Sequence, residues 1–378
     1  MSGFTPTLAV ITSQLGTVSE TFVRRHVEDL WPGKTVAVAL HASHPFGGRW
    51  EAAVPTLFLD EWKRQPVVRL LVRLGFSLDR LREKRIERFF RQHRVESVLV
   101  EYLDCCVPFV PLLDRLQIPY VVQGHGIDLS AALRVPATAA SYARLASARA
   151  ILTRCEFHRQ RLFALGLTKD KIHVNPGGID LPEILADRPS GAHKRLLAVG
   201  RMTPKKGPIF LLEAFRQAAL KDPELHLTYV GGGELAPAVR QFALASGLSH
   251  RIALPGTVSE SEKLKLLGKC AIFLQHSITD PETGDEEGLP AAIQEAMANG
   301  MAVVTTRHSG IPELVVDGQS GVIVEEGDCE SMAAAILTLS NNPGKIFEMG
   351  RRNREIIAGA HTWPHERRRL ISHLGLTE

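Results

Sequence analysis

Short apolar runs alternate with amphipathic stretches along the whole chain. Apolar runs bounded by turn residues predict buried strands, and apolar positions three and four apart predict helices. In the first half, strands are predicted over residues 7–12, 34–41, 97–102, 120–125 and 150–154, with helices over 21–30, 80–93 and 141–150. In the second half, strands are predicted over 195–201, 225–233, 251–256, 271–277 and 302–306, with helices over 208–220, 235–247, 260–269 and 290–299. This alternation predicts α/β structure with doubly wound parallel sheets.

The chain is too long for one ordinary core, because its 378 residues exceed the usual size of a single domain. Residues 175–194 concentrate Pro, Gly and Asp and are interpreted as a linker. We therefore predict two Rossmann-like domains over 1–185 and 186–355, and a helical segment over 356–378 that returns to the first domain or stays separate. Ligands of such sheets bind beyond the carboxyl ends of the strands, so we expect a site in a cleft between two facing domains.

Two loops that follow predicted strands carry candidate chemistry, and each has a plain structural alternative. Gly16 would let backbone N–H groups approach a phosphate, and Ser19 suits a helix N-cap, but taken alone this loop is better explained as an ordinary turn between a strand and a helix. His125 stands between two glycines in "GHGID", which disfavours a packed core histidine, and a contact with substrate is favoured over a structural turn.

A third loop, "RMTPKKG", holds Arg201, Lys205 and Lys206 directly after a strand. Three cations in six residues suit a diphosphate, since Arg provides a bidentate fork and Lys a point charge. A solvated basic loop is an equally good interpretation of this segment alone.

The stretch "DEEGLPAAIQEAMANG" places Glu287 before a predicted helix and Glu295 inside it. Pro290 suits the first helical position and Gly300 the position after the helix. Eight helical residues rise about 12 Å, whereas a paired-carboxylate glycosidase needs its carboxylates ~5–9.5 Å apart. The spacing therefore disfavours such a hydrolase and favours two contacts with one extended ligand.

Charge and cysteine content narrow the function classes further. The net charge is +4, and residues 63–94 hold most of the basic excess. A solvated helix pair explains that stretch, and contact with an anionic membrane is the sharper alternative. The five Cys show no metal-ligand spacing, and the N-terminal run does not look like a signal peptide, so we expect free thiols in a cytoplasmic protein.

Residues 286–324, "EEGLPAAIQEAMANGMAVVTTRHSGIPELVVDGQSGVIV", resemble the donor-binding signature of the family 4 retaining glycosyltransferases, which have the GT-B fold. "VGRMTPKKG", "VGGGE" and "GHGID" fall where that family has counterparts, and "SETF" and "GDEEGLP" look most like its bacterial exopolysaccharide, colanic-acid-type subset. The resemblance implies a nucleotide-sugar donor-binding domain after residue 186 and an acceptor-binding domain before it.

The resemblance also implies roles for the residues around the nucleotide and the sugar. Glu295 would bind the ribose hydroxyls, and Val258 and Ser259 would face the base. Glu287 would lie beside the donor sugar, and His125 would contact that sugar.

Further positions would surround the phosphates, namely Gly16, Arg201, Lys206, Gly288 and Leu289. Arg201 and Lys206 would neutralise the leaving diphosphate, where charge accumulates in the transition state. The residues so assigned to catalysis are His125, Glu287, Arg201 and Lys206.

The implied enzyme transfers a hexosyl group from a UDP- or GDP-sugar to a glycan or lipid-linked acceptor in cell-surface polysaccharide synthesis. It would need no cofactor and no essential metal, and the sequence has no Asp-x-Asp pair of the kind that holds a metal on a diphosphate. We expect no nucleic-acid partner, and a cytoplasmic location that extends to the inner face of the plasma membrane if the basic stretch binds lipid. A nucleotide-sugar epimerase or hydrolase of the same fold, and a non-catalytic binding protein, stay open as alternatives.

Overall fold

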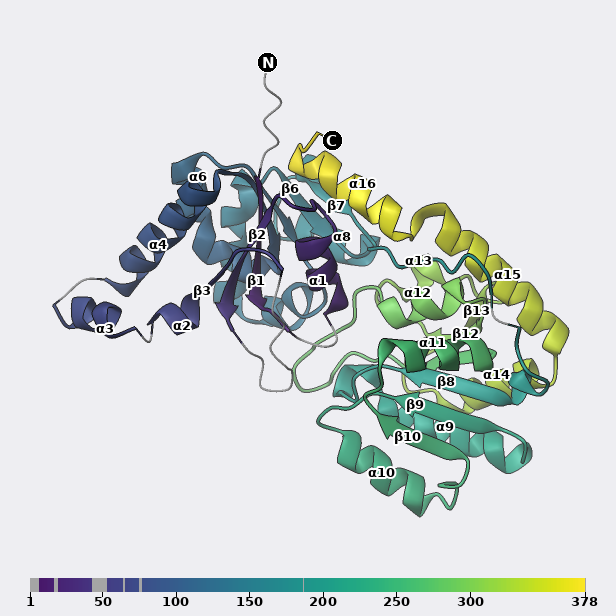
Figure 1. Cartoon of the computed structure of the whole chain (residues 1–378). Coiled ribbons are helices and arrows are strands. Elements are labelled where there is room, and N and C mark those ends of the chain that lie inside the picture. Colours follow the sequence, from purple (N-terminus) through teal and green to yellow (C-terminus); the bar gives the residue numbers. More distant parts are fainter. Residues whose placement is uncertain are drawn as a thin grey trace. The chain divides into compact units, whose positions relative to one another are not determined.

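The chain divides into two compact units, each built around one parallel sheet. The computed structural model describes residues 7–16, 20–42, 53–63, 65–74, 77–185 and 187–377. Unit 1 comprises Met1–Thr153, Arg159–Asn175 and Arg367–Glu378, and unit 2 comprises Arg154–His158 and Pro176–Glu366. Figure 1 shows the strands of unit 1 in purple to teal and those of unit 2 in teal to green. The predicted domains are parts of the chain that would fold independently, which this division into units does not test. Their bounds therefore stay a prediction.

Unit 1 contains a seven-stranded parallel sheet in the order β3-β2-β1-β4-β5-β6-β7. Its strands are β1 (Thr7–Gln14), β2 (Thr35–His41), β3 (Thr56–Phe58), β4 (Val95–Glu101), β5 (Tyr120–Gln123), β6 (Ala150–Thr153) and β7 (Ile172–Val174). The central strands are apolar on both faces, as expected for a parallel sheet that helices cover on both sides.

In the described part of the chain, seven α-helices and four 3₁₀ helices surround or follow these strands before β6. They are α1 (Thr21–Glu28), α2 (Leu59–Lys63), α3 (Pro66–Arg73), α4 (Leu78–His93), α5 (Leu103–Cys106), α6 (Val110–Leu116), α7 (Pro136–Ser141), and the 3₁₀ helices η2 (Ile127–Leu129), η3 (Ala131–Arg134) and η4 (Tyr142–Ser147). A further 3₁₀ turn, η1 (Val107–Phe109), joins α5 to α6. After β6 come α8 (Glu156–Ala164) and η5 (Lys169–Lys171).

Unit 2 contains a six-stranded parallel sheet in the order β10-β9-β8-β11-β12-β13. Its strands are β8 (Arg195–Val199), β9 (His226–Val230), β10 (Ile252–Gly256), β11 (Ile272–Gln275), β12 (Ala302–Thr306) and β13 (Gly321–Val324). Its helices are η6 (Ala192–Lys194), η7 (Pro204–Lys206), α9 (Pro208–Lys221), α10 (Ala236–Ala245), α11 (Glu260–Lys269), α12 (Ala291–Ala298), α13 (Ile311–Leu314), α14 (Cys329–Ser340) and α15 (Pro343–Ala360). The last helix, α16 (Trp363–Leu374), begins in unit 2 and ends in unit 1.

Alternating residues of the second sheet supply two separate hydrophobic cores. Leu196 of β8 and Val304 of β12 pack in one core with α9 and α14, whereas Leu197 and Val303 pack in the other with α12. Because successive strand residues point to opposite faces, this division shows that helices cover both faces. The predicted doubly wound parallel sheets are therefore confirmed.

All ten predicted strands are present, and the three strands that the pattern missed lie at sheet edges. These are β3, β7 and β13, of three or four residues each. The predicted helix over 141–150 is wrong, because α7 ends at Ser141 and a 3₁₀ helix follows over Tyr142–Ser147. Tyr142 and Leu145 are buried three positions apart, and a 3₁₀ helix places such residues on one face.

The helix predicted over 290–299 forms with slightly different ends. Pro290 is its N-cap residue, with an extended backbone, rather than its first helical residue. Gly300 follows the C-cap Asn299 with a φ of 66°, the left-handed conformation predicted for it. Among the described residues, no helix is both long and apolar enough to cross a membrane.

Candidate functional site

The loops that follow β8, β9 and β10 are joined to one another through their backbones. Three hydrogen bonds of 2.7–3.0 Å run from the N–H groups of Gly200, Met202 and Gly231 to the carbonyl oxygens of Val230, Gly232 and Gly256, respectively. Gly231 has a φ of 137°, and a Cβ there would lie 1.9 Å from the Gly200 carbonyl oxygen. Only a glycine permits this approach, so the "VGGG" loop holds the "VGR" loop in place.

Two more glycines permit equally close approaches around the basic loop. Gly207 has a φ of 50°, and a Cβ there would lie 2.1 Å from the carbonyl oxygen of His276, after β11. Gly233 has a φ of 146°, and a Cβ there would lie 2.7 Å from the Met202 carbonyl oxygen. The loop that carries the three cations is thus fixed by backbone at both ends.

Glu287 lies among the cations of that loop. Its Oε2 accepts a hydrogen bond from Lys206 Nζ at 3.0 Å, and its Oε1 is 3.7 Å from Lys205 Nζ. Lys205 also pairs with Asp285 at 2.9 Å and donates to the carbonyl oxygen of Glu286 at 3.3 Å. The structure therefore brings together the loop after β8 and the segment before α12, as the sequence predicts.

The two lysines keep Glu287 negatively charged. The positive charge of Lys206 is only partly balanced by Glu287. Burial would raise the pKa of Glu287, but Lys206 and Lys205 outweigh it and lower that pKa to about 2. Burial lowers the pKa of Lys206, and the neighbouring charges of Lys205 and Arg201 add to this effect against the attraction of Glu287. Arg201 is exposed and forms no ion pair with any carboxylate in the described part of the chain. The cluster presents unbalanced positive charge, which suits an anionic ligand.

A buried histidine fixes the backbone at Glu287. The Glu287 N–H donates to His308 Nε2 at 3.0 Å, so His308 carries its proton on Nδ1 and donates it to Glu326 Oε1 at 2.5 Å. The other Glu326 oxygen accepts the N–H of Thr279 at 2.8 Å. Sequence reasoning missed His308 and Glu326, although both directly follow strands in the way that the predicted site residues do.

Glu295 belongs to a second group in the same unit. Lys263 Nζ on α11 contacts both of its oxygens, at 2.9 and 3.0 Å, and contacts Glu260 at 3.0 Å. Burial opposes the charge of Lys263, but Glu295 and Glu260 outweigh it and raise its pKa. Ser259 begins the same helix with a capping box that it forms with Glu262, so α11 connects the predicted base-facing loop to Glu295.

Val258 completes this second group. It is partly buried against the apolar cluster that includes α12. The predicted positions therefore form two sets in unit 2, which are Arg201, Lys206, Glu287, Gly288 and Leu289 in the first and Val258, Ser259 and Glu295 in the second. The assigned roles of these residues stay predictions.

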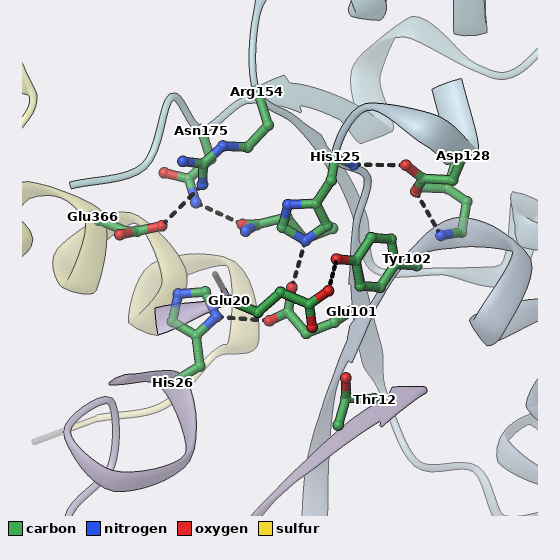
Figure 2. Close-up of polar contacts among 12 residues, drawn as sticks. Thr12, Glu20, His26, Glu101, Tyr102, His125, Asp128, Arg154, Asn175 and Glu366 are labelled. Atoms are coloured by element: carbon green, nitrogen blue, oxygen red, sulfur yellow. Dashed lines mark hydrogen bonds and ion pairs between the residues drawn. The ribbon is translucent and has the colours of Figure 1, made fainter. Parts of the chain in front are cut away.

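His125 and Gly16 belong to unit 1. Gly16 follows β1 with a φ of 106°, which suits glycine. Ser19 lies outside the described residues, and its prediction as the N-cap is wrong, because the N-cap residue of α1 is Glu20. His125 follows β5, and its Nε2 lies 2.8 Å from Oε2 of the buried Glu101 (Figure 2). Glu101 is the last residue of β4, and sequence reasoning missed it because it reads as the polar end of an apolar strand.

Glu101 is held by a second histidine. His26 Nδ1 on α1 lies 2.6 Å from Glu101 Oε1, and both residues are completely buried (Figure 2). Burial would raise the pKa of Glu101, but the charges and hydrogen bonds of His26 and His125 lower it to about 2. Glu101 is therefore an ionised carboxylate inside the protein.

The comparisons with known proteins agree with this organisation. The sequence model described as "Glycosyltransferase Family 4" matches residues 33–183, and that described as "Glycosyl transferases group 1" matches residues 186–360. The amylovoran biosynthesis glycosyltransferase AmsK of Erwinia amylovora is 32% identical over 244 residues, which are 62% of this chain and 60% of AmsK. The putative colanic acid biosynthesis glycosyltransferase WcaL of Salmonella typhimurium is 33% identical over 219 residues, 57% of this chain and 54% of WcaL.

The alignments span little more than half of the length of these curated relatives. The crystal structure of Anabaena Alr3699/HepE in complex with UDP has a TM-score of 0.78 at 17% identity and covers 98% of this chain and 99% of that one. At this identity the likeness shows the fold alone, and that fold is GT-B. The two sequence models match residues 33–183 and 186–360, and the fold agrees with them. The chain therefore belongs to the family 4 glycosyltransferases, and the group 1 domain is the carboxyl-terminal half of this chain.

Proposed function

We propose that the protein is a glycosyltransferase that moves a sugar from a nucleoside-diphosphate sugar to a hydroxyl group of a glycan or lipid-linked acceptor. The observation that carries this proposal is the cluster of Arg201, Lys206 and Glu287 in a chain of this family. Arg201 is free to form a bidentate contact with a phosphate, and Lys206 is a half-buried cation that gains from a second anion. Such a cluster stabilises the diphosphate as it departs with the bonding electrons.

The donor would be a UDP- or GDP-sugar, and the product a bacterial cell-surface polysaccharide. HepE binds UDP in its crystal structure, and AmsK and WcaL bear the names of amylovoran and colanic acid synthesis. In this proposal Glu295 accepts hydrogen bonds from the ribose, which must displace or join the Lys263 contact. Glu287 faces the donor sugar and stabilises positive charge that develops at the anomeric carbon.

Two finer features of the reaction belong to the proposal. We propose retention of the anomeric configuration, because the family resemblance implies it. We also propose that the diphosphate is neutralised by side chains and not by a metal, since Arg201 and Lys206 would supply positive charge to it. In the described part of the chain, no three His, Cys, Asp or Glu side chains gather in a way that could hold a metal ion.

A thermal-shift screen followed by product analysis tests this function. A nucleotide-sugar that binds the folded state raises the melting temperature by linkage, so UDP-, GDP- and ADP-sugars should separate. The stabilising donor is then incubated with and without glycan acceptors, and the products are identified by NMR. Transfer to an acceptor supports the proposal. An altered sugar or free sugar without transfer would assign the protein to the epimerases or hydrolases, and binding without turnover would make it a binding protein.

We further propose that unit 1 binds the inner face of the plasma membrane through α3 and the start of α4. Figure 1 shows α2, α3 and the start of α4 extending away from the sheet beyond its β3 edge. Four apolar side chains are exposed there, at fractions from 36 to 66%: Val67, Val72, Leu74 and Leu78. The exposed Arg69, Arg73 and Arg80 lie in the same two helices. Apolar side chains that can insert and arginines that can meet lipid phosphates suit an anionic interface.

Vesicle sedimentation tests this location. Each cation near an anionic surface contributes about 1 kcal/mol, so three arginines should concentrate the protein on anionic vesicles at low salt. We expect release at high salt and weak binding to neutral vesicles. Equal binding to both kinds of vesicle, or none at low salt, would contradict the proposal. The matched control is Arg91→Ala with Arg88→Ala, later on α4, which should change binding less than Arg69→Ala with Arg73→Ala.

A further inference from the structure

The buried Glu101 makes hydrogen bonds to two histidine rings, and these bonds determine which ring nitrogens carry protons. Glu101 is the last residue of β4, and its carboxylate is fully buried. One carboxylate oxygen contacts His26 and the other contacts His125 (Figure 2). An ionised carboxylate can only accept hydrogen bonds. The facing ring atoms, His26 Nδ1 and His125 Nε2, must therefore both carry protons.

This protonation leaves a defined atom of His125 for a ligand. A neutral imidazole carries one proton, so with Nε2 protonated the Nδ1 atom holds a free lone pair. His125 Nδ1 forms no hydrogen bond to any residue in the described part of the chain. The His125 side chain is 12% exposed, whereas those of His26 and Glu101 are completely buried. Of these three residues, His125 is thus the one that an outside ligand can reach.

Two aromatic rings lie against the ring of His125, and a carboxylate holds its backbone. The Phe22 ring lies 4.4 Å and the Tyr102 ring 4.6 Å from it, measured between centroids. Asp128 accepts the His125 N–H at 2.9 Å with one oxygen and the Leu103 N–H at 2.9 Å with the other. With the rotation of the ring so limited, Glu101 decides which nitrogen is presented.

We propose that Glu101 and His26 are positioning residues for His125: Glu101 holds the Nε2 proton of His125, His26 holds Glu101, and Nδ1 is thereby presented as an acceptor for a sugar hydroxyl of the substrate. Neither Glu101 nor His26 touches substrate in this arrangement. The inference deepens the proposed function and rests on it for its kinetic consequences. The proton arrangement itself does not depend on any activity.

A double-mutant cycle tests whether Glu101 acts through His125. Glu101→Gln keeps the shape of the side chain but leaves one acceptor oxygen where two rings need one each. We expect kcat/KM to fall on the order of 10²-fold, the loss typical of a misplaced catalytic group. The double variant, Glu101→Gln with His125→Ala, should lose no more kcat/KM than His125→Ala alone, because Glu101 then has no imidazole to position. If the losses in kcat/KM of the two single variants multiply in the double variant, the proposal is overturned. Glu87→Gln, at a half-buried carboxylate of unit 1 that pairs with Arg91 and Arg115 and not with a histidine, is the matched control and should stay near wild type.

An NMR measurement on the ligand-free full chain tests the proton arrangement without any assay of transfer. Histidine is labelled with ¹⁵N at both ring positions, and the signals of His125 are identified by their loss in His125→Ala. We expect neutral His125 to be protonated on Nε2 in the wild type, and Glu101→Gln or His26→Gln to shift it towards the other tautomer. An Nδ1-protonated His125 in the wild type, or a tautomer unchanged by Glu101→Gln, would overturn the proposal. If the protein proves not to transfer sugars, these results still stand on their own.

Discussion

Lys205 and Lys206 are adjacent in sequence, and the structure predicts that their replacement by Ala will have different consequences. Lys205 Nζ meets three acceptors within 3.7 Å, from Asp285, Glu286 and Glu287. Lys206 Nζ meets Glu287 at 3.0 Å, and burial together with the nearby cations lowers its pKa. Lys205 is thus satisfied inside the protein, whereas Lys206 has electrostatic capacity left for a ligand.

The expected magnitudes follow from these contacts. Lys205→Ala removes three contacts of a buried lysine, to Asp285, Glu286 and Glu287, so we expect about 3 kcal/mol less unfolding free energy. For a unit of this size that lowers the melting temperature by about 6–12 °C. Lys206→Ala removes a half-buried cation and leaves Glu287 with Lys205, so its effect on stability should be smaller. It removes one charge-assisted hydrogen bond to the diphosphate, about 2 kcal/mol or about 30-fold in Kd.

Two measurements on the same protein samples separate the variants. Urea unfolding gives the stability of each, and calorimetry with the donor found in the screen gives Kd. Lys221→Ala, at the exposed end of α9, is the matched control and should change neither quantity. We expect Lys206→Ala to weaken donor binding and transfer more than Lys205→Ala does. If Lys205→Ala cost more binding while remaining fully stable, the assignment of Lys206 to the diphosphate would be refuted.

Three other predictions address the carboxylates and the metal. Glu295→Ala should weaken donor binding by calorimetry, whereas Glu287→Ala should mainly lower kcat, and identical defects would argue against two separate roles. Because the pKa of Glu101 is lowered from 4.5 to about 2, its charge stabilises the folded state above pH 4.5, and this contribution of about 3 kcal/mol is lost as the pH falls to 2. The difference in unfolding free energy between the wild type and Glu101→Gln should shrink over that range, and a constant difference would show that Glu101 is not stabilised as a carboxylate. EDTA should leave transfer nearly intact, and full loss that Mn²⁺ restores would show that a metal holds the diphosphate.

The hydrophobic pattern identified the central strands because these are apolar on both faces and long enough to stand out. It missed β3, β7 and β13, since three or four residues at a sheet edge give too short a signal. That Glu287 and Lys206 lie near each other agrees with the rule that loops at the carboxyl ends of strands meet, but their ion pair was not predicted.

The partners of the predicted residues could not be found in the same way. Lys263 reaches Glu295 from a different helix, and its spacing in the sequence gives no sign of this contact. His26 and Glu101 are 75 positions apart, and each alone reads as an ordinary element end. Such pairs depend on how helices pack against the sheet, which local periodicity does not encode.

The close backbone contacts at Gly207, Gly231 and Gly233 limit how this protein can be diversified in the laboratory. A library that randomises the loops after β8 and β9 to change donor preference will lose most members at these three positions, because any Cβ would collide with a carbonyl oxygen of the adjoining loop. Variation is better placed on Lys263 of α11, whose side chain contacts Glu295 and Glu260 and does not hold the loops together. The same restriction means that the cation loop is already ordered before any donor arrives, so little conformational entropy is lost when one binds.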